Sequence, residues 1–244
     1  MPVIIGTSGW HYSDWKDFVY PAGLPQRQWL AHLSREFATV ELNNSFYRLP
    51  DRSTFEGWAA QVPEGFVFAV KVSRYLTHIR RLREPAEPVS RLLRQAEGLG
   101  SACGPFLLQL PPDLKADADA LDQTLIAFGP NRRVTAELRH PSWNNDDVRK
   151  VLERRHAACC WADRKGRLQP RWKTAEWGYV RMHEGGANPH PCYGQAALKS
   201  FATELSDTFS QGEDVFVFFN NDQGGCAVRN ARSLRKLLQN RTAA

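Results

Sequence analysis

Charged and amide side chains recur near the carboxyl ends of short apolar segments in this sequence. In the segment 39–43, Val40 and Leu42 alternate with Glu41 and Asn43. Because alternate side chains of a strand share a face, the two polar residues should point away from the apolar pair. The same alternation at other segment ends adds further polar residues to that face: Lys71, Gln109, Glu137, Arg139, Asp163, Arg181 and His183.

These residue types fit acid–base catalysis on an anionic substrate. Glu137 or Glu41 is the predicted general base. Lys71 and Arg139 are predicted to stabilise developing negative charge, and His183 to act as a general acid or a ligand. The amide and acid positions Asn43, Gln109 and Asp163 are predicted substrate contacts. The alternative is a closed salt-bridge layer, because burying many charges is costly unless they pair. That layer would set Glu41, Glu137 and Asp163 against Lys71, Arg139 and Arg181.

A second polar run, Asn220-Asn221-Asp222-Gln223-Gly224-Gly225, leads into a helix expected from about Ala227. A helix amino terminus after a late barrel strand is a common phosphate site. Asn220, Asn221, Gly224 and Gly225 are therefore predicted to bind substrate, with Arg181 and Arg229 assisting. The alternative is that the two glycines serve only a tight turn.

A divalent metal is one candidate cofactor, although its site is undetermined from the sequence. Glu41, Glu137, Asp163 and His183 are hard ligands of suitable type. The sequence contains no H-x-x-x-H or H-x-H pair, which weakens that hypothesis.

Three further residues follow the predicted strands and add binding chemistry. Trp10 and Tyr12 come just after the first strand and would stack a sugar or a base. Plain core packing is the alternative for both. His78 follows the third strand, where it would act as a general acid or contact phosphate. A solvated loop histidine is the alternative there.

Eight short segments are predicted as strands, at a mean spacing near thirty residues. Such spacing fits a strand followed by a crossover helix. The predicted strands are 3–9, 39–43, 66–72, 106–110, 134–139, 157–163, 178–183 and 215–221. Helical patterns occur at 26–37, 53–61, 145–155, 195–209 and 227–238. Residues 164–176 show no helical period and contain Pro170, so an irregular connection between strands six and seven is expected.

This alternation predicts a single α/β domain over residues 1–244, folded as a (β/α)8 TIM barrel. The catalytic face of such a barrel is formed by the carboxyl ends of its strands. An open doubly wound sheet is the alternative fold. The absence of G-x-G-x-x-G after the first strand weakens its dinucleotide-binding form.

Composition narrows the possible partners. The 244-residue chain has 42% hydrophobic and 24% charged residues, which excludes a disordered protein. Its net charge of +6 favours an anionic small molecule or a nucleic acid. Residues 71–94 contain seven Lys or Arg and two Glu. This basic stretch is either a binding surface or a solvated helix face. No apolar run is long enough for a membrane span, and no signal peptide is expected. Five cysteines without a C-x-x-C pair predict reduced thiols in a cytoplasmic protein.

Ordered motifs along nearly the whole chain resemble those of the YecE-like family, known as domain of unknown function 72. The matching stretches are 6–12 with Trp15 and 20–21, 40–50, 66–71 with 77–78, 108–112, 137–140, and 219–222 with Ala227 and 230–231. The resemblance implies a TIM barrel and no assigned activity. The family usually has His-Gly after strand seven, whereas here Glu184 follows His183.

Two hypotheses for the function follow. The first is an enzyme acting on a phosphorylated substrate, either a nucleic acid or a sugar phosphate, as a hydrolase or lyase that is metal-assisted in one version. The second is a non-catalytic binding protein for nucleic acid or a phosphometabolite. Loss of turnover on neutralising a carboxylate would favour the first hypothesis, whereas tighter anion binding would favour the second.

Overall fold

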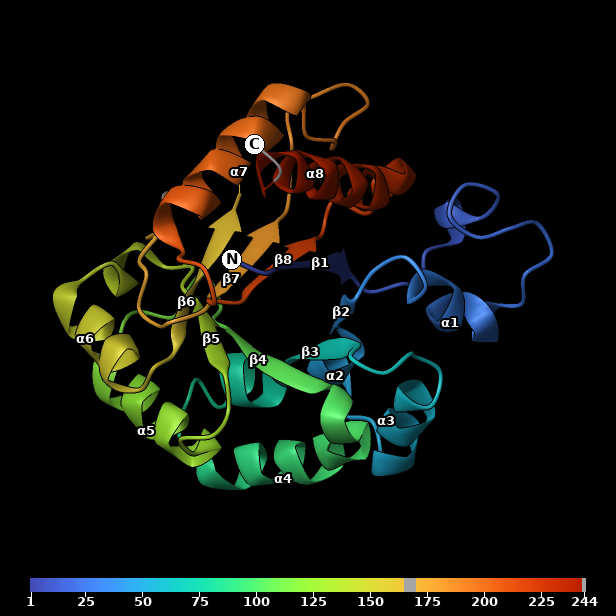
Figure 1. The fold of residues 1–244 in the computed structure, drawn as a ribbon. Helices are drawn as coiled ribbons and strands as arrows, with labels where there is room; N and C mark the ends of the chain where they lie inside the picture. The colour runs from blue at the N-terminus through green and yellow to red at the C-terminus, as the bar shows by residue number, and fades with distance from the viewer. Residues whose placement is uncertain (165–169, 243–244) are drawn as a thin grey trace.

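Eight parallel strands close into a barrel in the computed structural model, which describes residues 1–164 and 170–242. Each strand pairs with its neighbours in chain order, and β8 closes the ring on β1 (Figure 1). The strands are β1 Val3–Ser8, β2 Thr39–Leu42, β3 Val67–Lys71, β4 Cys103–Gln109, β5 Val134–Glu137, β6 Ala158–Asp163, β7 Gly178–Met182 and β8 Val215–Phe219. This confirms the predicted TIM barrel.

Helices surround the strands as an outer layer (Figure 1). They are α1 Trp29–Leu33, α2 Asn44–Tyr47, α3 Arg52–Ala59, α4 Ala86–Ala96, α5 Ala118–Phe128, α6 Asp146–Arg154, α7 Gln195–Thr208 and α8 Cys226–Thr242. The sequence patterns located five of these positions and missed α2, α4 and α5. The connection from β6 to β7 contains no helix in its described part, residues 170–177, as expected.

Local sequence explains where two of these helices begin. The Asn145 side chain accepts a hydrogen bond from the Val148 amide and caps α6, with Asp146 and Asp147 in the first turn. The Asp117 side chain caps α5 in the same way through the Ala120 amide. Such caps satisfy backbone donors that the helix itself leaves unpaired.

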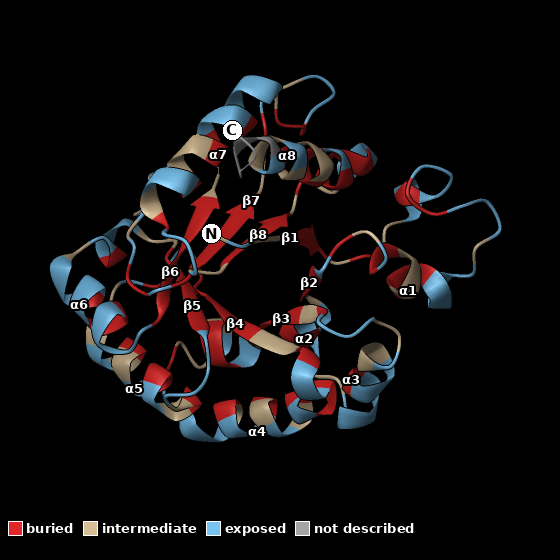
Figure 2. Cartoon of the chain, viewed as in Figure 1, coloured by how far each residue is buried: buried red, intermediate tan, exposed pale blue. Residues whose placement is uncertain are grey.

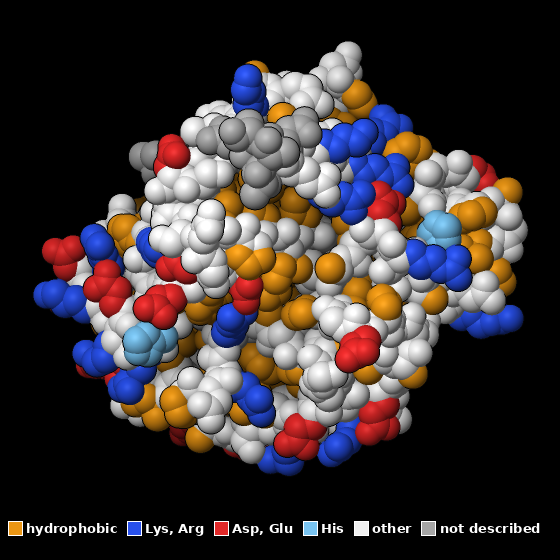
Figure 3. Space-filling model, in the orientation of Figure 1, with side chains coloured by type: hydrophobic (Ala, Val, Ile, Leu, Met, Phe, Trp, Pro, Cys, Tyr) orange, Lys and Arg blue, Asp and Glu red, His pale blue; other side chains and the backbone are white. Residues whose placement is uncertain are grey.

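The strands divide the apolar core into two clusters. The outer cluster packs the strands against the helices, and the smaller inner cluster fills the barrel lumen with residues that include Ala69, Leu107, Cys160, Tyr179 and Phe218. Figure 2 shows the strands as almost entirely buried, while the helices carry buried residues toward them and exposed residues outward. On the face seen in Figure 3, hydrophobic side chains gather in the central hollow and charged side chains lie mainly around it.

The prediction of five reduced cysteines is wrong for one pair. Cys192 and Cys226 form a disulfide, whereas Cys103, Cys159 and Cys160 are free. Cys192 precedes α7 and Cys226 begins α8, so the two residues come from the connections that follow the adjacent strands β7 and β8. Spacing in the sequence cannot reveal such a pair, because the barrel topology brings its members together. Among the described residues, no helix combines the length and the apolar character that crossing a bilayer requires.

Candidate active site at the carboxyl ends of the strands

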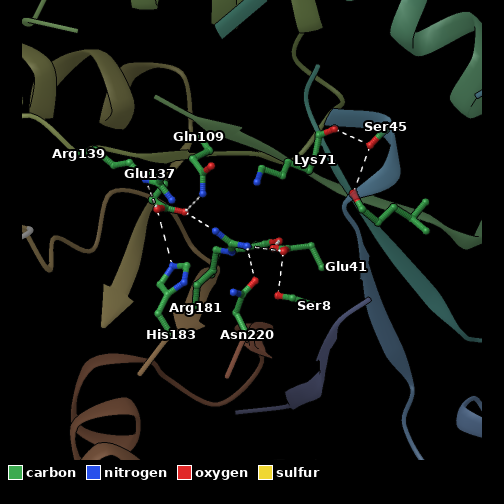
Figure 4. A network of polar contacts seen from close by, with 12 residues as sticks. Ser8, Glu41, Ser45, Lys71, Gln109, Glu137, Arg139, Arg181, His183 and Asn220 are labelled. Atoms are coloured by element: carbon green, nitrogen blue, oxygen red, sulfur yellow. Dashed lines mark hydrogen bonds and ion pairs between the residues drawn. The ribbon is translucent and has the colours of Figure 1, made fainter. Parts of the chain in front are cut away.

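A charged layer lies across the lumen just above the apolar inner cluster (Figure 4). Glu41 comes from β2, Lys71 from β3, Glu137 from β5 and Arg181 from β7. All four side chains are buried, with Glu41 and Glu137 fully excluded from solvent and Arg181 only 2% exposed. The alternation read from the sequence therefore placed these four residues correctly.

Arg181 occupies the centre of the layer and joins the two carboxylates. Its Nη1 donates to Glu137 Oε2 at 2.7 Å, and its Nη2 donates to Glu41 Oε1 at 2.7 Å. The same Nη2 donates to Asn220 Oδ1 at 2.9 Å, which places Asn220 at the lumen as predicted. Two buried carboxylates therefore share one guanidinium.

Other donors complete the shells of both carboxylates. Glu41 also accepts hydrogen bonds from Ser8 at 2.9 Å and from the Tyr179 hydroxyl at 2.6 Å. Glu137 accepts from Gln109 Nε2 at 2.9 Å and from Arg139 Nε at 2.7 Å. The sequence analysis missed Ser8 and Tyr179, although Tyr179 lies two residues before Arg181 and therefore shares its face.

These contacts argue against either glutamate as the general base. Burial alone would raise the pKa of Glu41 and of Glu137, but the Arg181 charge and the hydrogen bonds hold both pKa values below the ordinary one. A carboxylate stabilised in this way is a weak base. For these two residues the arrangement matches the salt-bridge alternative rather than the acid–base prediction.

Lys71 differs from the rest of the layer because it has no carboxylate partner among the described residues. Its Nζ lies 4.1 Å from the centre of the Phe46 ring, and the side chain is 8% exposed. Burial, followed by the Arg181 charge, lowers the pKa of Lys71 to about 8. With Arg139 and Arg181, three cations face two carboxylates, so these five side chains carry an excess of positive charge and Lys71 is the cation without an ion pair.

His183 lies at the end of β7 above Glu137, with Nε2 3.8 Å from Glu137 Oε1. Burial, followed by the Arg181 charge, lowers the pKa of His183 to about 3. The imidazole is therefore neutral at pH 7. The prediction that His183 serves as a general acid or a ligand remains untested, but as an acid it would have to donate from the neutral ring.

Asp222 is an acid that the sequence analysis did not select. It follows β8, and the Tyr12 hydroxyl lies beside its carboxylate while donating to the Ser8 carbonyl. Burial, together with the Glu41 charge, raises the pKa of Asp222 to about 7. A carboxyl group with such a pKa exchanges protons readily at neutral pH. Its position in the run after β8 was the available signal.

Asn43 and His78 also lie at this end of the barrel. Asn43 directly follows β2 and immediately precedes α2, and its Oδ1 is buried. His78 belongs to a single π-helical turn, Tyr75–Ile79, that follows β3. Its ring packs edge-on against Phe46 at 5.0 Å, and its Nδ1 bonds Thr77 Oγ1 at 2.8 Å. Burial, followed by the Arg139 and Lys71 charges, lowers the pKa of His78.

Asp163 does not face the lumen, so its predicted orientation is wrong. Its side chain lies 3.7 Å from Arg171 in the connection that follows β6. Trp161, on the same face of the strand, packs against Phe209 at the end of α7. The lumen side of β6 is formed by the small residues Ala158, Cys160 and Ala162. Because both faces of β6 are apolar, alternation could not distinguish them.

The phosphate cradle predicted after β8 is not assembled. The Gly224 amide donates to Asp14 Oδ2 at 2.8 Å, so a carboxylate already occupies that donor. Gly225 packs beneath the Phe18 ring, and Arg229 stacks on that same ring at 4.4 Å. These contacts favour the turn alternative for the two glycines.

Two other predicted contacts are structural. Asn221 is buried outside the lumen, where its Nδ2 donates to the Pro191 carbonyl at 3.0 Å. Trp10 is buried against Trp58, with ring centres 5.6 Å apart. Neither side chain faces the charged layer.

The divalent metal considered as one candidate cofactor finds no preformed site in the described part of the chain. No group of three His, Cys, Asp or Glu side chains is arranged to hold a metal ion there. The oxygens of Glu41 and Glu137 already accept bonds from arginine, amide and hydroxyl donors. A metal would have to displace those donors.

Unsatisfied polar atoms gather at the same end of the barrel. In the part of the chain that the structure describes, buried atoms without a hydrogen-bond partner include Asn43 Oδ1, Arg181 Nε, His183 Nε2 and Asp222 Oδ1. Each belongs to the end of a strand or to the residues just after one. Since buried polar atoms are usually paired, this concentration is typical of a binding site.

Comparisons with known proteins agree with the fold. The chain matches the family described as protein of unknown function DUF72 over residues 4–244. UPF0759 protein YunF of Bacillus subtilis is 24% identical, with 97% of this chain and 94% of that protein covered. A DUF72 family protein from Thermotoga maritima has a TM-score of 0.82 at 26% identity, covering 98% of this chain and all of that one. The structure of SacUVDE shares the fold alone, at a TM-score of 0.56 and 8% identity over 99% of both chains. The chain therefore belongs to the DUF72 family, which the YecE-like name also fits.

Proposed function

We propose that this protein is an enzyme that binds a phosphorylated substrate at the carboxyl ends of its barrel strands. The observation that carries the proposal is the buried Lys71 amine, which has no carboxylate partner among the described residues. Proteins rarely bury a lysine without a counter-charge. A bound anion would supply that counter-charge.

The neighbours of Lys71 support an anion rather than a cation as the ligand. Arg139 lies beside Glu137 in the same layer, with its side chain 15% exposed, so it reaches toward the opening. Both lumen carboxylates are compensated internally, which leaves the excess positive charge for a ligand. Asp222, with a pKa of about 7, has the acid strength that proton transfer at neutral pH requires.

The hydrogen bonding of the two lumen carboxylates and the acid strength of Asp222 favour a lyase over a metal-assisted hydrolase. A metal-assisted hydrolase needs open carboxylate ligands, and Glu41 and Glu137 are saturated with donors. A lyase needs a proton acceptor and a site for developing negative charge, for which Asp222 and Lys71 have the appropriate character.

A second candidate, a nucleic-acid-binding protein, is favoured by the surface beside Lys71. Tyr47 in α2 is 74% exposed and Tyr75 in the π-helical turn is 44% exposed. Arg48 and Arg74 flank these rings, are exposed, and have no ion pair among the described residues. Exposed rings interleaved with cations are typical of surfaces that stack bases and track phosphates.

A thermal-shift comparison of ribose 5-phosphate with ribose tests the proposal. A ligand at about 100 times its Kd adds roughly 2.7 kcal/mol of stability. We expect ribose 5-phosphate to stabilise the wild type and the Lys115→Met control, which changes an exposed lysine. Lys71→Met should lose the shift. Equal shifts in all three proteins, or no phosphate-dependent shift in any, would refute the proposal.

A short single-stranded oligonucleotide separates the two candidates. If the stacking surface binds nucleic acid, affinity for the oligonucleotide should fall steeply with salt and weaken in Tyr47→Ala. If only the lumen binds anions, Tyr47→Ala should behave as the wild type.

A further inference from the structure

We propose that Lys71 is a nucleophile that forms an imine with an aldehyde or ketone group of the substrate. This inference rests on the proposed function for the substrate's phosphate, but it concerns a different event, the formation of a covalent bond. Under this proposal Lys71 bonds covalently to the substrate, whereas charge stabilisation requires only a non-covalent contact.

The position of Lys71 meets the two conditions that activate a lysine amine. Lysine becomes a nucleophile when it is desolvated against apolar groups or placed next to other cations. Lys71 is buried against the Phe46 ring, and the charge of Arg181 adds to the effect of burial, while the charges of Glu41 and Glu137 partly oppose it. None of the described carboxylates forms an ion pair with the Lys71 amine, although the charges of Glu41 and Glu137 act on it from further away and partly favour its ammonium form.

The backbone around Lys71 is held firmly, which fixes where the amine can reach. The Ser45 hydroxyl donates to the Lys71 carbonyl at 2.6 Å, which ties the start of α2 to the end of β3. The next residue in α2, Phe46, places its ring under the amine on one side and against His78 on the other. Figure 4 shows the Lys71 side chain extending from β3 into the lumen, toward the residues of the charged layer.

The protonation state agrees with this role. Burial and the neighbouring Arg181 charge lower the pKa of Lys71 to about 8, from 10.5 for an ordinary lysine. At pH 7 the unprotonated fraction is then roughly 300 times that of an exposed lysine. Lys71 stays mostly charged, so it still attracts a phosphate, while a usable fraction is free to attack carbon.

The reaction balances without an added oxidant or metal. The free Nζ attacks the carbonyl carbon, a C–N bond forms, and the carbonyl electron pair moves to oxygen. That oxygen takes one proton from the attacking nitrogen and one from an acid, and it leaves as water when the C–O bond breaks. The product is a protonated imine, and the positive charge on its Nζ corresponds to the proton that the acid supplied. Asp222, with a pKa of about 7, is an acid of suitable strength at this end of the barrel, and solvent is the alternative donor.

Trapping with pyridoxal 5′-phosphate and borohydride tests the proposal on the unmodified protein. The probe carries an aldehyde and a phosphate, and reduction converts any imine to a stable secondary amine. Peptide mapping at pH 7 should find Lys71 labelled at least 100-fold faster than Lys115, an exposed lysine in the same chain. Lys71→Met should lose this label while Lys115→Met keeps it. Labelling of Lys71 no faster than Lys115 would overturn the proposal.

Two further arms separate this proposal from the proposed function. If both hold, inorganic phosphate should protect Lys71, and pyridoxal without phosphate should label it more slowly. If Lys71 is labelled rapidly by both aldehydes and phosphate gives no protection, the imine proposal stands and the anion site fails. If phosphate binds but Lys71 is not labelled above Lys115, the anion site stands and the imine proposal fails.

Discussion

Replacing Arg181 by Met should reveal how strongly the charged layer depends on its central guanidinium. The change removes the bonds from Arg181 to Glu41 Oε1 and Glu137 Oε2, both 2.7 Å long, while a similar side-chain volume is kept. Two fully buried carboxylates then lose their shared counter-ion. Breaking a buried pair from one side costs roughly 3–5 kcal/mol.

The pH dependence provides the specific signature of this effect. In the wild type, the pKa values of Glu41 and Glu137 are lowered in the folded state. Their contribution to stability is therefore present above the unfolded pKa near 4.3 and is lost as the pH falls through the folded values. In Arg181→Met, burial should raise the pKa of Glu41 above its unfolded value, because Glu137 retains its ion pair with Arg139, whereas Glu41 retains neutral hydrogen-bond donors and only the unpaired charge of Lys71.

The magnitude follows from the cost of protonating Glu41. Keeping one carboxyl protonated at pH 7.5 against a pKa near 4.5 costs about 4 kcal/mol, at about 1.36 kcal/mol per pH unit. The deficit of Arg181→Met should therefore be about 3–5 kcal/mol at pH 7.5 and shrink to about 1–2 kcal/mol at pH 4.5. Urea denaturation followed by tryptophan fluorescence at both pH values measures it.

Arg149→Met is the matched control. It makes the same chemical change in an exposed ion pair with Glu153 on α6, which should change stability by no more than about 0.5 kcal/mol at either pH. A deficit below about 1 kcal/mol in Arg181→Met at pH 7.5, or a deficit that does not depend on pH, would refute this account of the charged layer.

Three further predictions concern stability elsewhere in the fold. Gly6→Ala should destabilise the protein by several kcal/mol or prevent folding, because the new Cβ would lie 2.1 Å from the Thr39 carbonyl oxygen. The control Gly57→Ala places its Cβ in open space, so it should be neutral or stabilising by about 0.5–1 kcal/mol. Urea denaturation measures both effects. The folded pKa of Asp222, about 7, is above its unfolded value, so its contribution to folding stability should be present at low pH and be lost between about pH 4 and 7. Asp222→Asn should therefore make stability less dependent on pH across that window. Asn145→Ala should lower stability by about 1 kcal/mol through loss of the α6 cap, seen as a decrease in Tm of a few degrees.

Alternation along the strands predicted most of the candidate site because one face of each strand is distinctly apolar. Glu41, Lys71, Glu137 and Arg181 alternate with residues that pack against the outer helices, so their direction into the lumen follows from the pattern. The alternation predicted the wrong orientation for the Asp163 side chain, because β6 is apolar on both of its faces.

Other features depended on contacts that a pattern does not contain. The sequence placed Glu137 and Glu41 as bases, yet their partners turn both into compensated carboxylates. The sequence predicted that the Gly224 amide would bind phosphate, but that amide donates its hydrogen bond to Asp14, which is far away in the sequence. The helices α4 and α5 were not predicted, although α4 carries its buried residues Val89, Leu92 and Ala96 at helical spacing.

The central claim is that Lys71 provides the charge for an anion at the mouth of the barrel, and sulfate binding as a function of pH tests it most directly. Sulfate keeps its charge between pH 6 and 9, so a change in its affinity reports on the protein. Isothermal titration of the wild type should give a Kd that rises about tenfold between pH 7 and 9, as Lys71 loses its proton near pH 8. Lys71→Met should bind weakly and show no such rise, whereas Lys115→Met should follow the wild type. Equal sulfate affinity in the wild type and Lys71→Met at pH 7 would contradict the account.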